Sequence, residues 1–152
     1  MTTDGISTED WDQVRGLACQ IVNTSSQGNE EASSKYTERL LLLLDNLQAK
    51  YGELPSLLAT RADYIEDLSE RLRLLKKAYE LAERRQDRSN QGLIASSIAQ
   101  IYIEELANLE NSGVWLDALE KSLDGSSSQG DVEEFNKLKK KVERLKALPQ
   151  TS

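Results

Sequence analysis

The sequence predicts an all-α fold built as a stack of antiparallel helical hairpins. Leu is abundant, Pro occurs only twice in 152 residues, and apolar residues recur at helical spacing in one segment after another. The segment around Ala62 and Ile65 also returns loosely around Ala99 and Tyr102, at an offset of 37 residues. Repetition at this period is typical of stacked hairpins, each of which needs its neighbours to bury its apolar face.

Length and composition predict a single domain with frayed ends. We expect a disordered start over residues 1–7, one helical-repeat domain over 8–148 and a disordered tail over 149–152. About seven helices make up the domain, and the last of them caps the stack. The expected parts are three hairpins, at about 8–50, 55–87 and 89–124, and a capping helix at 131–148.

Two apolar stripes predict the first hairpin. One helix begins near Ser7 or Thr8, with acidic residues in its first turn, where they favour the helix dipole. A loop that contains Ser and Gly leads to a second helix over about 31–50. Because Leu41 and Leu42 widen the stripe of this helix, we expect neighbours to contact it on two sides.

The second hairpin depends on a predicted interruption between two helices. Pro55 suits the first turn of a third helix. Asp67, with Glu70 three positions later, has the pattern of a capping box that would start a fourth helix. The alternative is one continuous helix over 56–86.

Caps and a loop define the last three helices. Ser89 or Asn90 is expected to cap the fifth helix, and a short sixth helix follows it. Residues 125–130, rich in Gly and Ser, predict a flexible loop. Asp131, with Glu134 three positions later, is expected to cap the seventh helix.

Small and large residues alternate where the predicted helices meet. Ala62 with Ile65, and Ala99 with Tyr102, pair a small residue with a large one three positions later. A second small residue, Ala78, lies in the helix that follows the first pair. These features resemble the tetratricopeptide repeat family, whose units are helical hairpins of about 34 residues.

The resemblance covers about residues 55–124 and extends weakly over 8–50. It implies a right-handed stack with a concave inner surface. Members of the family generally act as scaffolds that hold peptides or partner proteins in such a groove. On this basis we expect a protein-binding adaptor or scaffold.

Charge is distributed in alternating blocks along the chain. The net charge is −7, and the blocks are 1–70 with −8, 71–88 with +4, 89–134 with −8 and 135–152 with +5. Such a pattern fits neighbouring surfaces of opposite charge within the fold, or a face that binds a charged partner.

Composition predicts a cytoplasmic protein. No apolar run approaches the ~20 residues that span a bilayer, and the start of the chain is polar and acidic, unlike a signal peptide. The single Cys19 cannot form an intramolecular disulfide. We expect Cys19 to fill space in the core or at its boundary.

The residue types argue against catalysis. The chain has no His, which removes the commonest general base and the usual nucleophilic and zinc machinery. Adjacent acidic pairs such as Glu104 and Glu105 point about 100° apart on a helix and so do not share a face. We therefore expect no enzyme, no cofactor and no metal site.

Five side chains are the candidates for contact with a partner. Arg61 occupies an apolar register position, where a guanidinium anchors an anion. Tyrosines in the repeat-like region present amphipathic rings, and amides read a peptide backbone. The candidates are Arg61, Tyr64, Gln100, Tyr102 and Asn108.

Two helices carry a candidate basic surface. Its residues are Arg71, Arg73, Lys76, Lys77, Lys139, Lys140 and Lys141. Phosphate binding needs an attractive field over the binding face, and this chain is acidic overall, so nucleic acid is not the expected partner.

Protein binding is the leading functional expectation, with two alternatives. One is a small acidic immunity or inhibitor protein that neutralises a basic partner. The other is a structural module that self-associates through an exposed Leu40–Leu44 face, so that the chain would be a homodimer rather than a monomer.

Overall fold

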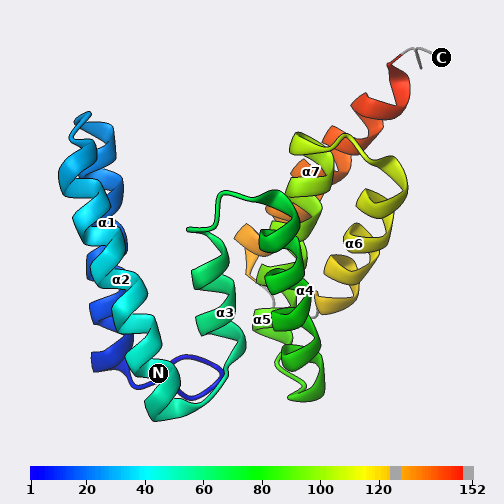
Figure 1. The fold of residues 1–152 in the computed structure, drawn as a ribbon. Helices are drawn as coiled ribbons and strands as arrows, with labels where there is room; N and C mark the ends of the chain where they lie inside the picture. Colours follow the sequence, from blue (N-terminus) through cyan, green and yellow to red (C-terminus); the bar gives the residue numbers. More distant parts are fainter. Residues whose placement is uncertain (124–127, 149–152) are drawn as a thin grey trace. The chain divides into compact units, whose positions relative to one another are not determined.

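The described part of the chain is predominantly helical. The structure is a computed structural model that describes residues 1–123 and 128–148. These residues form seven α-helices, one π-helical turn and no strand, which confirms the all-α class (Figure 1). The elements are α1 (Thr8–Ser26), α2 (Glu30–Tyr51), α3 (Pro55–Ala62), α4 (Leu68–Arg84), α5 (Arg88–Gln100), the π-helix η1 (Ile101–Glu105), α6 (Leu109–Ser122) and α7 (Gln129–Ala147).

The chain divides into two compact units, Met1–Leu74 and Leu75–Ser152. The boundary falls inside α4, and each unit has a buried apolar cluster of its own. Each unit is therefore described by itself. The predicted stacking of hairpins stays a prediction.

The first unit is built on a helical hairpin. α1 and α2, joined by residues 27–29, lie side by side (Figure 1). Ser7 caps α1 by accepting a hydrogen bond from the backbone of Asp10, and Asn29 caps α2 in the same way. The core between the elements of this unit contains Ile6, Val14, Ile21, Leu40, Leu44, Leu47, Leu54 and Leu57.

The expectation of disorder over residues 1–7 is wrong. The Ile6 side chain is fully buried. The Asp4 carboxylate accepts hydrogen bonds from the backbone N–H and the hydroxyl of Ser56, at 2.8 and 2.9 Å. Because Leu54, the residue before α3, offers no side-chain cap, Asp4 caps this helix from a distant part of the chain.

The break between α3 and α4 is real, and the alternative of a continuous helix over 56–86 is wrong. α3 ends at Ala62, and Asp67 accepts a hydrogen bond from the backbone of Glu70 at the start of α4. Arg71 holds the connection closed, since its guanidinium donates two hydrogen bonds, at 2.9 and 2.6 Å, to the carbonyl of Ile65.

The second unit contains a second hairpin with a covering helix. α5 and α6 lie side by side, and α7 packs against both. α5 and α6 approach closely at Gly92, where an added Cβ would lie 2.8 Å from the Ser122 hydroxyl. The buried cluster of this unit is Ala95, Ala99, Ile103, Leu116, Leu119, Leu138 and Val142.

Two predicted caps are wrong by a few residues. Asp87, rather than Ser89 or Asn90, caps α5. Ser128 caps α7, and Asp131 completes a capping box from the third helical position. Most of the predicted loop over 125–130, and the tail over 149–152, lie outside the described residues.

A π-helical turn, η1, ends α5 and was not predicted. Leu106 donates its backbone hydrogen bond to Ile101, and Ala107 then adopts a left-handed conformation with φ of 46°. The backbone of Asn108 closes this end by donating to Tyr102 at 2.8 Å. A wider turn of this kind is uncommon in helices, and no single residue type encodes it.

Candidate functional site

The candidate site is a shallow groove of about 580 Å³ along the outer face of the α1–α2 hairpin. It lies entirely within the first unit, and we call it the α1–α2 groove. Its lining residues are Gln13, Gly16, Leu17 and Gln20 from α1, and Tyr36, Arg39, Leu42, Leu43 and Asn46 from α2.

The floor of the α1–α2 groove is apolar. Leu17, Tyr36 and Leu43 are partly buried and pack against the core of the unit. Leu42 also lines the groove, and 62% of its surface is exposed. Apolar side chains thus continue from the core to the surface here, as occurs where another molecule covers a protein.

A glycine opens the α1 wall of the groove. An added Cβ at Gly16 would meet no atom within 4 Å, so packing within the chain does not require a glycine. A glycine inside an exposed helix costs about 0.5–1 kcal/mol relative to alanine. The absent side chain leaves room for a close neighbour at the groove.

Arg39 supplies the positive charge of the groove. Its guanidinium lies over the Tyr36 ring, 5.6 Å from the centroid, where the ring face attracts a cation. The other basic residues of α2 are engaged in ion pairs, Lys35 with Glu31 and Lys50 with Asp10. Within the described residues, no carboxylate pairs with Arg39.

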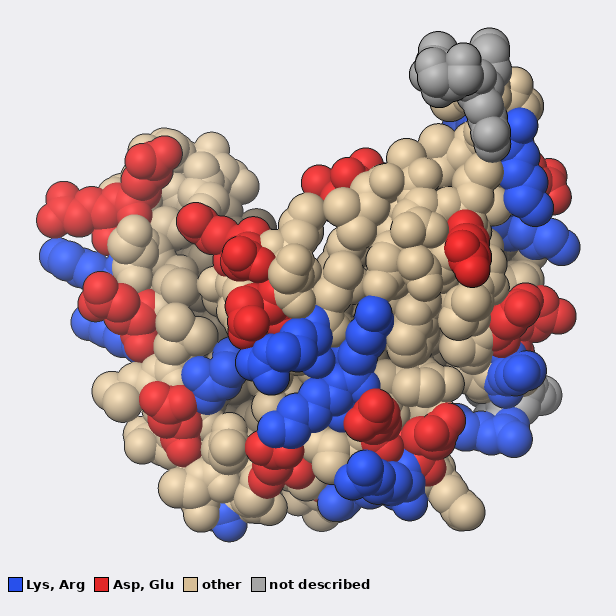
Figure 2. All heavy atoms as spheres, turned by 45° about the vertical axis from the view of Figure 1, so that its right-hand side comes forward, with Lys and Arg blue, Asp and Glu red and all other residues tan. Residues whose placement is uncertain are grey.

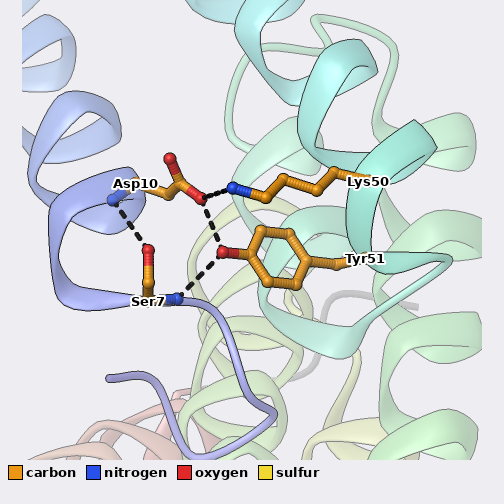
Figure 3. A network of polar contacts seen from close by, with 4 residues as sticks. All are labelled: Ser7, Asp10, Lys50 and Tyr51. Atoms are coloured by element: carbon orange, nitrogen blue, oxygen red, sulfur yellow. Dashed lines mark hydrogen bonds and ion pairs between the residues drawn. The ribbon is translucent and has the colours of Figure 1, made fainter.

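A polar network fixes the two walls against each other (Figure 3). The Asp10 carboxylate at the start of α1 accepts hydrogen bonds from Lys50, at 2.8 Å, and from the Tyr51 hydroxyl, at 2.5 Å. The Tyr51 oxygen in turn accepts one from the backbone of Ser7, at 3.2 Å. The hydrogen bonds from Lys50 and Tyr51 lower the pKa of Asp10.

Two of the five candidate side chains lie in the first unit. The Arg61 guanidinium pairs with Asp45 at 2.6 Å. The Tyr64 ring packs, half-buried, against the unit's core. Burial, and then the charge of Asp63, raise the pKa of Tyr64. Neither residue lines the α1–α2 groove.

The other three candidates lie in the second unit and make contacts within it. Gln100 donates a hydrogen bond to Glu134 at 2.7 Å. Tyr102 is buried, and its hydroxyl accepts one from Lys76 at 2.8 Å. The Asn108 side chain caps α6. The structure gives each of the three a contact within the second unit.

Five of the seven predicted basic residues make contacts within the chain. Arg73 pairs with Glu70, and Lys141 with Glu104; Arg71 and Lys76 bind the groups described above, and Lys77 also has a partner. Lys139 and Lys140 are exposed on α7. On the face shown in Figure 2, basic side chains lie beside acidic ones.

Part of the α1–α2 groove had a signal in the sequence. The leucines beyond the main stripe of the second helix indicated contacts on two sides, and Leu42 lies on the second of these. Gly16, Leu17 and Arg39 were missed, because they fall outside the apolar stripes. Cys19, expected as core or boundary filler, is exposed on α1.

Metal and membrane signals are absent from the described part of the chain. No group of three or more His, Cys, Asp or Glu residues in residues 1–123 and 128–148 is arranged to hold a metal ion. In the same residues, no helix combines the length and apolar character needed to cross a membrane.

Comparisons with known proteins give no relative from which to assign a function. No family model, no curated protein and no solved structure matches the chain. The functional argument therefore depends on the geometry of the α1–α2 groove.

Proposed function

We propose that the chain is a non-catalytic protein–protein interaction module that binds a partner in the α1–α2 groove. The observation that carries the proposal is the exposed apolar floor, with Leu42 at 62% exposure beside the partly buried Leu17 and Leu43. Burying apolar surface drives most protein association, at roughly 25 cal/mol per Å² before the costs of binding.

The lining of the groove suits binding better than chemistry. It consists of leucines, a tyrosine, three amides, a glycine and one guanidinium. An arginine stays protonated in proteins, and amides are neither nucleophiles nor bases at neutral pH. Tyrosine and arginine are the side chains that contribute most often to protein-binding hot spots.

The concave surface expected from the tetratricopeptide resemblance stays a prediction. So does a cytoplasmic location. The proposal keeps the adaptor function and assigns the contact to other residues than the five first considered.

Site-specific crosslinking in cells tests the proposal. A photo-crosslinking amino acid replaces Leu42 in the full chain, and the matched control replaces Leu93, which is also 62% exposed but belongs to the second unit. We expect a discrete protein adduct from position 42 that is lost when Gly16→Leu fills the groove. Circular dichroism checks that the variants stay folded.

Two results would contradict the proposal. One is the absence of adducts from position 42. The other is an equal set of adducts from both positions that Gly16→Leu leaves unchanged. An adduct with a second copy of this chain would support the self-associating alternative instead.

A further inference from the structure

We infer that the occupant of the α1–α2 groove is an amphipathic α-helix of another protein, which places large apolar side chains on the floor and a carboxylate against Arg39. The inference rests on the proposed function and names the class of partner. Three properties of the groove carry it: its direction, its charge and its lack of self-complementarity.

The groove runs between two long neighbouring helices. α1 has 19 residues and α2 has 22, so each is about 30 Å long at 1.5 Å per residue. A third helix packs along such a surface with its side chains between theirs. Leu17, Leu42 and Leu43 would then meet apolar residues spaced i, i+3, i+4 and i+7 on the partner.

A helix also suits an apolar floor because its backbone is internally hydrogen-bonded. An extended segment would place N–H and C=O groups against leucine side chains, and an unpaired buried polar group costs about 1–3 kcal/mol. The described residues contain no β-strand whose edge could pair with an extended segment. The amides of Gln13, Gln20 and Asn46 line the groove beside the leucines and can contact polar side chains of a helix.

The charge of the groove is opposite to that of its unit. Residues 1–74 carry 7 basic and 13 acidic side chains, a net charge of −6. Among the described lining residues, the charged side chain is Arg39. Covering the floor would remove water from around this guanidinium, and a carboxylate in the partner would then form a charge-assisted hydrogen bond with it.

The same lining argues against a second copy as the occupant. In a symmetric dimer the same patch faces itself. Two copies of the α1–α2 groove would bring two Arg39 side chains to the interface with no lining carboxylate to receive them. Burying such charges unpaired is costly, so the complementary surface belongs to a different protein.

A displayed library of helix-forming peptides tests the inference. The peptides are about 16 residues long, which spans some 24 Å as a helix, and the bait is the full chain. We expect enrichment of sequences with apolar residues at helical spacing and an Asp or Glu on their edge. The purified peptides should become helical when bound, as circular dichroism measures.

A charge exchange then tests the role of Arg39. Arg39→Glu should weaken the binding of the best acidic peptide at least about tenfold. Replacing the acidic residue of the peptide by Lys should restore its binding to this variant. Arg15→Glu is the matched control, because Arg15 is an exposed arginine of α1 that does not line the groove. Fluorescence anisotropy gives the dissociation constants.

Three results would overturn the inference. They are enriched peptides that contain Pro and lack helical spacing, equal binding by Arg39→Glu and the unchanged chain, and a dimer in sedimentation that Leu42→Lys dissociates. If residue 42 still crosslinks to another protein while the library yields no acidic helix, the inference fails and the proposed function stands.

Discussion

At the scale of single residues, Asp4 has the most consequence for folding of the first unit. Asp4 is 4% exposed, and its carboxylate accepts both hydrogen bonds from Ser56 in the first turn of α3. Thr2 donates a further hydrogen bond to the same carboxylate, at 2.6 Å. Asp4 therefore caps α3 from a distant part of the chain, whereas neighbouring side chains cap α1 and α2.

Asp4→Ala is expected to lower the free energy of unfolding by about 1–2 kcal/mol, because it removes the cap and leaves the Ser56 N–H without its acceptor. Asp4→Asn, which keeps an acceptor but loses the charge, should cost less. Urea denaturation followed by circular dichroism measures both. A free energy of unfolding for Asp4→Ala equal to that of the unchanged chain would mean that the Asp4 cap adds no stability.

No sequence pattern revealed this role. An acidic residue among small polar ones near the start of a chain is typical of disorder, and its partner lies 52 positions away. The helix of that partner has an apolar residue, Leu54, at its cap position. A helix that lacks a capping side chain at its own start indicates that a residue elsewhere in the chain caps it.

At the scale of elements, the Asp10 network joins the start of α1 to the end of α2. Asp10 lies in the first turn of its helix and Lys50 in the last turn of the other, so each charge also favours the dipole of its own helix. The hairpin is therefore closed at one end by residues 27–29 and at the other by side chains.

This network predicts a loss of stability in acid. The pKa of Asp10 is lowered in the folded chain relative to about 3.9 when unfolded. Its contribution is therefore fully present above pH 4 and disappears as the pH falls through the folded value. Asp10→Asn should make the stability of the first unit less dependent on pH below about 4.

Thermal unfolding between about pH 2 and pH 6 measures this effect. Asp12→Asn is the control, because Asp12 is an exposed carboxylate on the same helix. If the two variants change the pH dependence equally, the network makes no special contribution.

The elements themselves were largely predictable from the sequence. Apolar periodicity predicted the α1–α2 and α5–α6 hairpins, and the capping-box pattern at Asp67 and Glu70 predicted the break before Leu68. The caps were misplaced because Ser, Asp and Asn crowd these boundaries: Asp87, Ser89 and Asn90 all suit the start of α5. In the structure the Asn90 backbone N–H donates a hydrogen bond to the Asp87 carboxylate, so Asp87 is the cap.

At the scale of the whole molecule, the main feature is the division of the chain into two compact units. Each unit has a buried apolar cluster of its own, and the boundary between the units lies in α4. A count of residues does not show which apolar side chains meet, so this division was not available to sequence reasoning.

Leu44→Ala tests the division. Leu44 is fully buried in the first unit, and its truncation should cost about 2–5 kcal/mol. We expect hydrogen exchange, followed by mass spectrometry, to accelerate in α1 and α2 more than in α5–α7. Leu138→Ala, in the cluster of the second unit, should give the reverse pattern. Equal acceleration everywhere would show that the chain unfolds as one body.

The exposed Cys19 has a practical consequence. As the chain's one cysteine, it offers maleimide dyes a single point of attachment on α1, without any engineered substitution. It lies three positions after Gly16, which lines the α1–α2 groove, and residues three apart are neighbours on a helix. An environment-sensitive fluorophore on this thiol would therefore report occupation of the groove directly, in titrations with the natural sequence.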